Sequence, residues 1–113
     1  MTLSGLVTKL GLRVFNGEIP LDRRVGGGYS GDLLSDVMAN SRKDDLWVTM
    51  QVHENIVAVA VLKELAGIVL VNGREPAPGT LEQARKEGVP ILGTSLTAFE
   101  LVGKLYGLGL KRI

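Results

Sequence analysis

Several kinds of residue are rare or missing in this sequence, and each absence excludes a class of protein. None of the 113 residues is a cysteine, so disulfides, zinc fingers and iron–sulfur clusters are excluded. His53 is the single histidine, and in the absence of cysteine one histidine cannot form a zinc site alone. No apolar run approaches the ~20 residues that a membrane helix needs. We therefore expect no metal, no bound cofactor and no membrane-spanning segment.

Aromatic residues and net charge are also scarce. Phe, Trp and Tyr make up 4% of the chain, so the core must come from the aliphatic side chains among the 45% that are hydrophobic. Thirteen basic and twelve acidic residues give a formal net charge of +1, which provides no general attraction to nucleic acid or to an anionic membrane. The N-terminal stretch lacks the pattern of a signal peptide. These features predict a cytoplasmic protein whose residues 1–113 form one domain.

What the sequence does contain is an alternation of helical and extended patterns. Apolar spacing, caps and turn residues predict helices at 2–10, 32–39, 56–62, 80–87 and 97–105, and strands at 12–15, 23–29, 46–50, 67–71 and 90–92. In the second half, strand and helix alternate strictly, which requires crossover connections. The predicted fold class is α/β, with a mostly parallel or mixed sheet and flanking helices.

The segment 56–62 is ambiguous because its residues, Ile-Val-Ala-Val-Ala-Val-Leu, also favour a strand. Asn55 is placed where a helix N-cap is expected, so we assign a helix. A helix that is apolar on nearly every side is buried on more than one side. We therefore expect it to lie at the interface of a homodimer, with residues 26–34 as the alternative interface.

A glycine run at residues 26–31 raises the question of a phosphate-binding loop. Gly26, Gly28 and Gly31 match the GxGxxG pattern of dinucleotide-binding proteins. The residues before them, Leu-Asp-Arg-Arg-Val, do not form a buried strand, and no acid follows the next strand, so the match is accidental. Either the glycines allow close packing, or their amides form an anion nest from Arg23, Gly26, Gly27 and Gly28.

The strongest candidates for a binding site follow the three regular strands. Ligands of parallel sheets bind beyond the carboxyl ends of the strands. The polar residues placed there suit an anion or a phosphate, and they are His53, Asn55, Asn72, Gly73, Arg74, Thr94 and Ser95. Each also has a structural interpretation as a helix cap, a turn residue or a solvated side chain. No nucleophile has a base beside it, so no catalytic residue is assigned. Asp44 and Asp45 are expected to be solvated in a charged loop.

Several segments resemble the DRTGG domain family. Residues 22–23, 26–29 and 32–40 carry the resemblance, as do residues 45–49, 53–60, 68–75 and 90–100. The similarity spans nearly the whole chain. The threonine of the family's name is replaced here, with Gly26 in its place, which removes any role of that hydroxyl.

The resemblance implies a fold like the N-terminal domain of HPr kinase/phosphorylase, which lacks that enzyme's catalytic P-loop. Such domains also occur beside CBS domains in regulated pyrophosphatases, in some phosphotransacetylases, and as separate proteins associated with iron hydrogenases. The implied function is a non-catalytic, homodimeric regulatory domain that binds a small anion, with an adenine nucleotide as one candidate, or a partner protein. Two alternatives stay open: an assembly module of a hydrogenase-associated or kinase-associated complex, and a small enzyme using His53 and Arg74.

Overall fold

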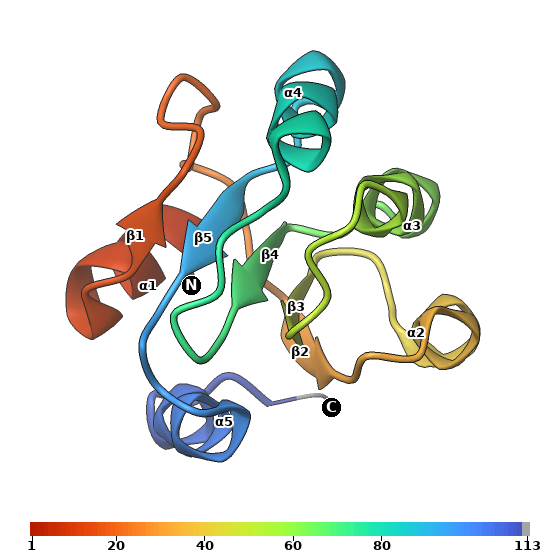
Figure 1. The fold of residues 1–113 in the computed structure, drawn as a ribbon. Coiled ribbons are helices and arrows are strands. Elements are labelled where there is room, and N and C mark those ends of the chain that lie inside the picture. The colour runs from red at the N-terminus through yellow and green to blue at the C-terminus, as the bar shows by residue number, and fades with distance from the viewer. Residues whose placement is uncertain (112–113) are drawn as a thin grey trace.

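The structure is a computed structural model that describes residues 1–111, which contain five helices and five strands (Figure 1). From β2 onward, strand and helix alternate. In chain order the elements are α1 (Leu3–Leu10), β1 (Arg13–Val14), β2 (Gly27–Ser30), α2 (Leu34–Asn40), β3 (Asp45–Thr49), α3 (Asn55–Lys63), β4 (Gly67–Leu70), α4 (Pro78–Glu87), β5 (Ile91–Gly93) and α5 (Ala98–Gly107). None of these helices has both the length and the apolar character needed to cross a bilayer.

The strands form one mixed sheet in the order β1-β5-β4-β3-β2. Strands β2 to β5 are parallel to their neighbours, and the short strand β1 pairs antiparallel with the edge of β5. The predicted α/β class with a mostly parallel or mixed sheet is confirmed. Because β3, β4 and β5 run in the same direction, the loops that follow them leave the same edge of the sheet.

Side chains of the central strands alternate between two cores. In β3, Leu46 and Val48 point to one core and Trp47 points to the other. Helices α1 and α5 cover the first face, and α2, α3 and α4 cover the second (Figure 1). Continuous apolar strands are expected when both faces of a parallel sheet are covered. Leu110 in the C-terminal tail joins the first core, and residues 112–113 of that tail lie outside the described residues.

Helices α1, α4 and α5 have ends that follow capping signals in the sequence. The side chain of Thr2 accepts a hydrogen bond from the N–H of Gly5 at the start of α1. Gly11 and Gly88 end α1 and α4 in the left-handed conformation, which favours glycine because it has no Cβ. Thr97 and Glu100 form the predicted capping box of α5. Local sequence signals therefore set these helix boundaries.

Helix α3 forms as predicted, but its surroundings differ from the prediction. Ile56, Val57, Val59 and Ala60 are buried within the chain itself, between the sheet and the neighbouring helices. The apolar faces of this helix therefore do not require a subunit interface, and that step of the sequence argument was wrong. Asn55 is also the first residue of the helix, not its N-cap.

The glycine run is part of the sheet. Gly27 and Gly28 lie in β2, paired with Asp45 and Leu46 of β3, and the N–H of Gly26 donates to the carbonyl of Asp44 at 2.9 Å. None of the three glycines has a positive φ, so the run does not form the concave turn of an anion nest. The strand expected at 23–29 thus starts later than predicted, at Gly27.

The reason for glycine at position 27 is a buried carboxylate. Asp45 is 2% exposed, which corrects the expectation that it is solvated, and its Oδ2 accepts a hydrogen bond from the N–H of Arg42 at 2.8 Å. A Cβ at position 27 would lie 2.8 Å from Asp45 Oδ1. At Gly28 the nearest atom to such a Cβ is the carbonyl oxygen of Leu46, at an ordinary contact distance of 3.6 Å.

We predict that Gly27→Ala lowers the free energy of unfolding by about 1–3 kcal/mol, because the new methyl group displaces a held, buried side chain. Urea unfolding followed by the fluorescence of the single, buried Trp47 measures this loss. Gly28→Ala is the matched control and should change stability much less. Equal losses in the two variants would contradict the packing role of Gly27.

Candidate functional site

Three loops meet at the edge where β3, β4 and β5 end. The N–H of Gly73 donates to the carbonyl of Thr94, and the N–H of Asn72 donates to the carbonyl of Leu96, both at 2.9 Å. The Asn72 side chain also contacts Sδ of Met50 through its Nδ2 at 3.0 Å. These bonds join the loops after β4 and β5 and attach them to the end of β3. The structure thus brings the three loops together, as expected from parallel strands.

The predicted site residues nevertheless face two separate depressions of the surface. Gly73, Arg74, Thr94 and Ser95 line the first, which we call the cationic hollow. His53 and Asn55 line the second, the α3–α4 groove, where His53 Nδ1 lies 2.7 Å from Asn55 Oδ1. The prediction that the three loops lie at one edge of the sheet is correct. It did not include the position of His53 in a groove between α3 and α4.

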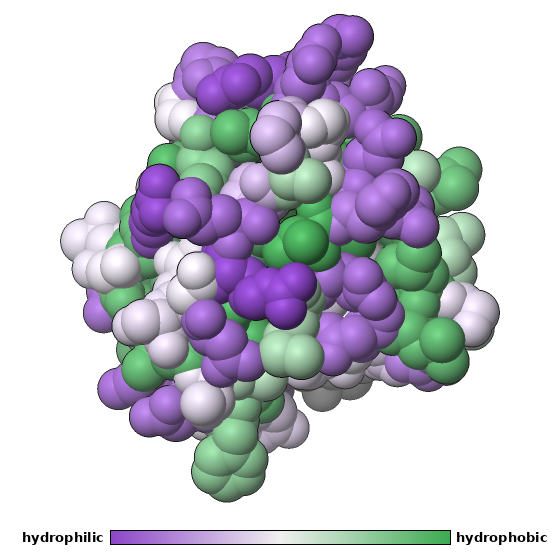
Figure 2. Space-filling model, viewed as in Figure 1, coloured by the Kyte–Doolittle hydropathy of each residue, from purple (hydrophilic) through white to green (hydrophobic). Residues whose placement is uncertain are grey.

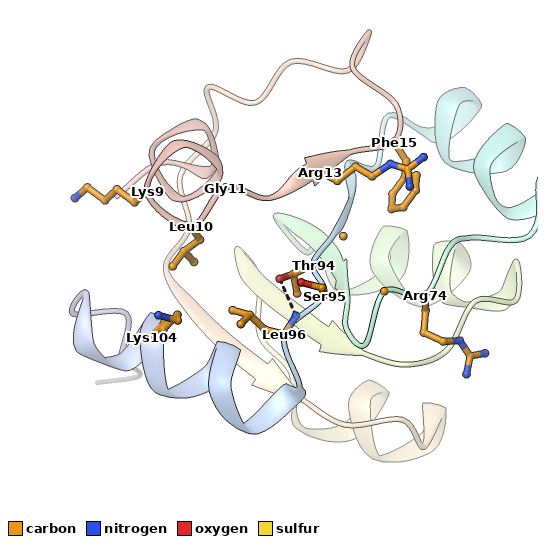
Figure 3. Close-up of a pocket in the computed structure, with 12 residues that line it drawn as sticks. Lys9, Leu10, Gly11, Arg13, Phe15, Arg74, Thr94, Ser95, Leu96 and Lys104 are labelled. Atoms are coloured by element: carbon orange, nitrogen blue, oxygen red, sulfur yellow. Dashed lines mark hydrogen bonds between the residues drawn. The ribbon is translucent and has the colours of Figure 1, made fainter.

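The cationic hollow has a volume of about 500 Å³ and is surrounded by basic side chains (Figure 3). Lys9 comes from the last turn of α1, Arg13 from β1, Arg74 from the turn after β4, and Lys104 from α5. No carboxylate is among the described residues that line it. The fold thus assembles four cations from four separate segments around one depression at the strand ends.

Few of these charges are neutralised within the chain. Arg13 pairs with Glu75 at 3.6 Å, and both side chains are about two-thirds exposed. Among residues 1–111, Lys9, Arg74 and Lys104 have no carboxylate within ion-pair distance. In Figure 3, Lys9 and Arg74 extend outward from Thr94 and Ser95, so these cations stand at the rim. Long exposed side chains of this kind are free to turn toward an anion.

The floor of the cationic hollow combines polar and apolar groups. Thr94 and Ser95 supply hydroxyls, and Thr94 Oγ1 already accepts a hydrogen bond from the N–H of Leu96 at 3.2 Å. Leu10, Phe15 and Leu96 supply apolar surface. A depression of this size with a few polar groups among apolar ones is typical of a small-molecule site.

Four residues of the hollow, which come from α1, from β1 and the residue after it, and from α5, were not predicted. Lys9, Arg13, Phe15 and Lys104 reach the hollow because β1 pairs with β5 and because α1 and α5 cover the same face of the sheet. The pairing partner of a two-residue strand is not visible in a local pattern. The only available signal was the short extended segment that follows the capping residue Gly11.

Asp32, which follows the glycine run, has a structural role at the neighbouring strand ends. Its Oδ1 accepts hydrogen bonds from Thr49 Oγ1 at 2.7 Å and from the N–H of Met50 at 2.8 Å. Gln51 Nε2 donates to the carbonyl oxygen of Asp32 at 2.9 Å. Asp32, which directly follows the last glycine of the apparent dinucleotide motif, therefore fixes the loop after β3.

The Arg23 proposed for an anion nest lies elsewhere. Its guanidinium donates to the carbonyl oxygens of Ala66 and Gly88, at 3.5 and 3.3 Å, close to the amino ends of β4 and β5. That is the end of the sheet opposite the cationic hollow. Within the described part of the chain, no group of three His, Asp or Glu side chains is placed to hold a metal ion.

Comparison with known proteins supplies a fold and no family. No protein-family model and no curated protein matches the sequence. Among solved structures, the chain is similar to the crystal structure of the CBS and DRTGG domains of the regulatory region of Clostridium perfringens pyrophosphatase, complexed with the activator diadenosine tetraphosphate. The TM-score is 0.65 at 14% identity, and the match covers 90% of this chain and 44% of that one. The chain thus shares an α/β fold with a DRTGG-containing regulatory region, as the sequence resemblance implied.

Residues 94–96, which line the cationic hollow, lead directly into the capping box of α5. The pKa of Glu100 in this capping box is lowered. Hydrogen bonds from the backbone N–H and the hydroxyl of Thr97 stabilise the Glu100 carboxylate and, with the charge of Lys104, lower its pKa below the ordinary value. A lowered carboxyl pKa contributes stability that is present above the unfolded-state pKa and is lost as the pH falls through the folded-state pKa.

We predict that Thr97→Ala raises the pKa of Glu100 toward its ordinary value, because one hydrogen-bond donor and the reciprocal cap are removed. A carbon-detected NMR titration of the Glu100 carboxyl in both proteins measures the shift. Ser95→Ala, in the same loop but outside the capping box, is the control variant and should leave the pKa of Glu100 unchanged. An unchanged Glu100 pKa in the variant would contradict the capping box.

Proposed function

We propose that residues 1–113 form one non-catalytic regulatory domain whose cationic hollow binds a small anionic ligand. The observation that carries this proposal is the set of four basic side chains around one hollow without a lining carboxylate. Phosphorylated compounds are the ligand class that such a site favours, since Lys and Arg are the side chains that bind phosphate. The similar structure supports this direction, because that regulatory region was crystallised with a nucleotide activator.

The geometry does not favour the alternative enzyme. His53 lies in the α3–α4 groove and Arg74 at the rim of the cationic hollow, so the two side chains proposed for catalysis do not share a cavity. Within residues 1–111, the His53 ring forms hydrogen bonds only with Asn55, the first residue of α3. Such hydrogen bonds are typical of a residue at the start of a helix. They therefore support a regulatory role of the domain over a catalytic one.

We predict that tripolyphosphate and ATP, in metal-free buffer, raise the thermal unfolding temperature of the protein. A ligand at 100 times its dissociation constant adds about 2.7 kcal/mol of stability when it binds only the folded state. Differential scanning fluorimetry with phosphate, tripolyphosphate, AMP and ATP measures the shift. Arg74→Ala should reduce it, because the variant removes one cation from the rim.

Arg42→Ala is the matched control, since Arg42 is an exposed arginine just before β3, at the opposite end of the sheet. It should leave the shift unchanged. No stabilisation by any of the four compounds would overturn the ligand-binding proposal and favour the assembly module. An equal loss in both arginine variants would mean that binding follows overall charge and not this hollow.

We also propose that the domain forms a homodimer through exposed apolar side chains just before α2 and at the end of α3. Leu33 is 68% exposed and Leu62 is 70% exposed, and Val61 next to it is partly exposed. Val61 and Leu62 also line the α3–α4 groove. Figure 2 shows hydrophobic surface on the right, over the positions of α2 and α3. The three side chains belong to the two segments expected at the interface, 56–62 and 26–34, whereas most other apolar residues of α3 are buried in the core.

We predict that Leu62→Glu converts the dimer to a folded monomer. Burying one leucine side chain contributes about 1.5–3 kcal/mol, and a two-fold interface buries it twice. Sedimentation equilibrium measures the mass, and circular dichroism verifies folding. Phe99→Glu, at a 90% exposed position on α5, is the control that should remain dimeric. A monomeric wild-type protein, or an unchanged mass for Leu62→Glu, would contradict the proposed interface.

A further inference from the structure

One wall of the cationic hollow is a stack of planar groups. The ring of Phe15 lies against Gly93 so closely that a Cβ at position 93 would be 2.7 Å from Phe15 Cε2. The Arg13 guanidinium carbon lies 4.4 Å from the centroid of the same ring, and the two side chains overlap in Figure 3. The ring of Phe15 therefore contacts both Gly93 at the edge of β5 and the guanidinium of Arg13.

The guanidinium of this stack is held in place but exposed. Arg13 is attracted to the negative face of the Phe15 ring and also pairs with Glu75 at 3.6 Å. Its side chain is still 63% exposed. Two partners thus restrict the orientation of the guanidinium, while most of the side chain remains accessible. Guanidinium planes of this kind are surfaces on which nucleobases stack.

We propose that the ligand of the cationic hollow is a nucleotide whose base stacks on Arg13 and whose phosphates are bound by Lys9 and Lys104. This inference rests on the proposed function and adds the ligand class. In Figure 3 the Arg13 and Phe15 stack lies on one side of Thr94 and Ser95, and Lys9 and Lys104 lie on the other. The site is therefore asymmetric, with a planar end and an ammonium end.

The shape and charge of the site agree with such a ligand. The volume of about 500 Å³ lies within the range of about 300–1,000 Å³ that small-molecule pockets have. A single phosphate ion would leave the planar end uncovered. The α3–α4 groove, although larger, is lined by Glu54 and Glu87, whose carboxylates repel phosphate. The hydroxyls of Thr94 and Ser95, between the two ends, are placed to contact a ribose.

The experiment compares ATP with tripolyphosphate by isothermal titration calorimetry of the full chain in metal-free buffer. The two probes share the phosphate chain, and only ATP carries a base. We expect ATP to bind about tenfold more tightly, which corresponds to about 1.4 kcal/mol and lies within the range for stacking one base. Arg13→Lys keeps the positive charge and removes the plane, so it should abolish this preference while tripolyphosphate still binds.

Arg74→Lys is the matched control, because Arg74 stands at the rim without an aromatic partner, and it should keep the preference for ATP. Equal affinities of the wild-type protein for ATP and tripolyphosphate would overturn the nucleotide inference and leave the proposed anion site intact. Binding of neither compound would overturn both. A preference for ATP that survives in Arg13→Lys would also overturn the assignment of the stacking surface to Arg13.

Discussion

The pairing of β1 with the edge of β5 is the contact on which the candidate site depends. Only two residues on each strand pair, but the contact is reinforced by Asn16, which is fully buried. Asn16 Nδ2 donates to the carbonyl of Val89 at 2.7 Å, and its Oδ1 accepts from the N–H of Ile91 at 2.9 Å. A buried polar group that loses such partners costs about 1–3 kcal/mol. This clamp holds the end of α1 beside the loop after β5, and so it brings Lys9 and Arg13 to the cationic hollow.

Local physical chemistry explains which parts of this arrangement were predictable. The apolar run of β4 indicated a doubly covered strand, and Gly11, Gly88 and Thr97 marked helix ends, because each of these signals acts within a few residues. The antiparallel addition of β1 and the division of the strand-end loops between two depressions were not predictable, since they depend on contacts between distant segments. The same holds for Gly27, whose requirement comes from the buried carboxylate of Asp45 on the next strand.

The distribution of charge gives the two depressions different characters. Around the cationic hollow, Lys9, Arg74 and Lys104 form no ion pair within the described chain, although the charge of Lys104 also acts on the Glu100 carboxylate. The positive charges at the hollow therefore outnumber the carboxylates near them. The α3–α4 groove combines apolar surface with Glu54 and Glu87. The proposed regulatory role requires an anion at one surface and association through another, and the two depressions differ in charge accordingly.

The central claim is that ligand binding takes place where β1, the turn after β4 and the loop after β5 meet. Two-dimensional NMR of the isotopically labelled protein, titrated with tripolyphosphate, tests it directly because each backbone amide reports on its own surroundings. The account expects the amides of Gly11, Gly73, Thr94 and Ser95 to shift together and saturably. Shifts confined to the groove at His53 and Glu87, or spread evenly over the basic surface, would contradict it.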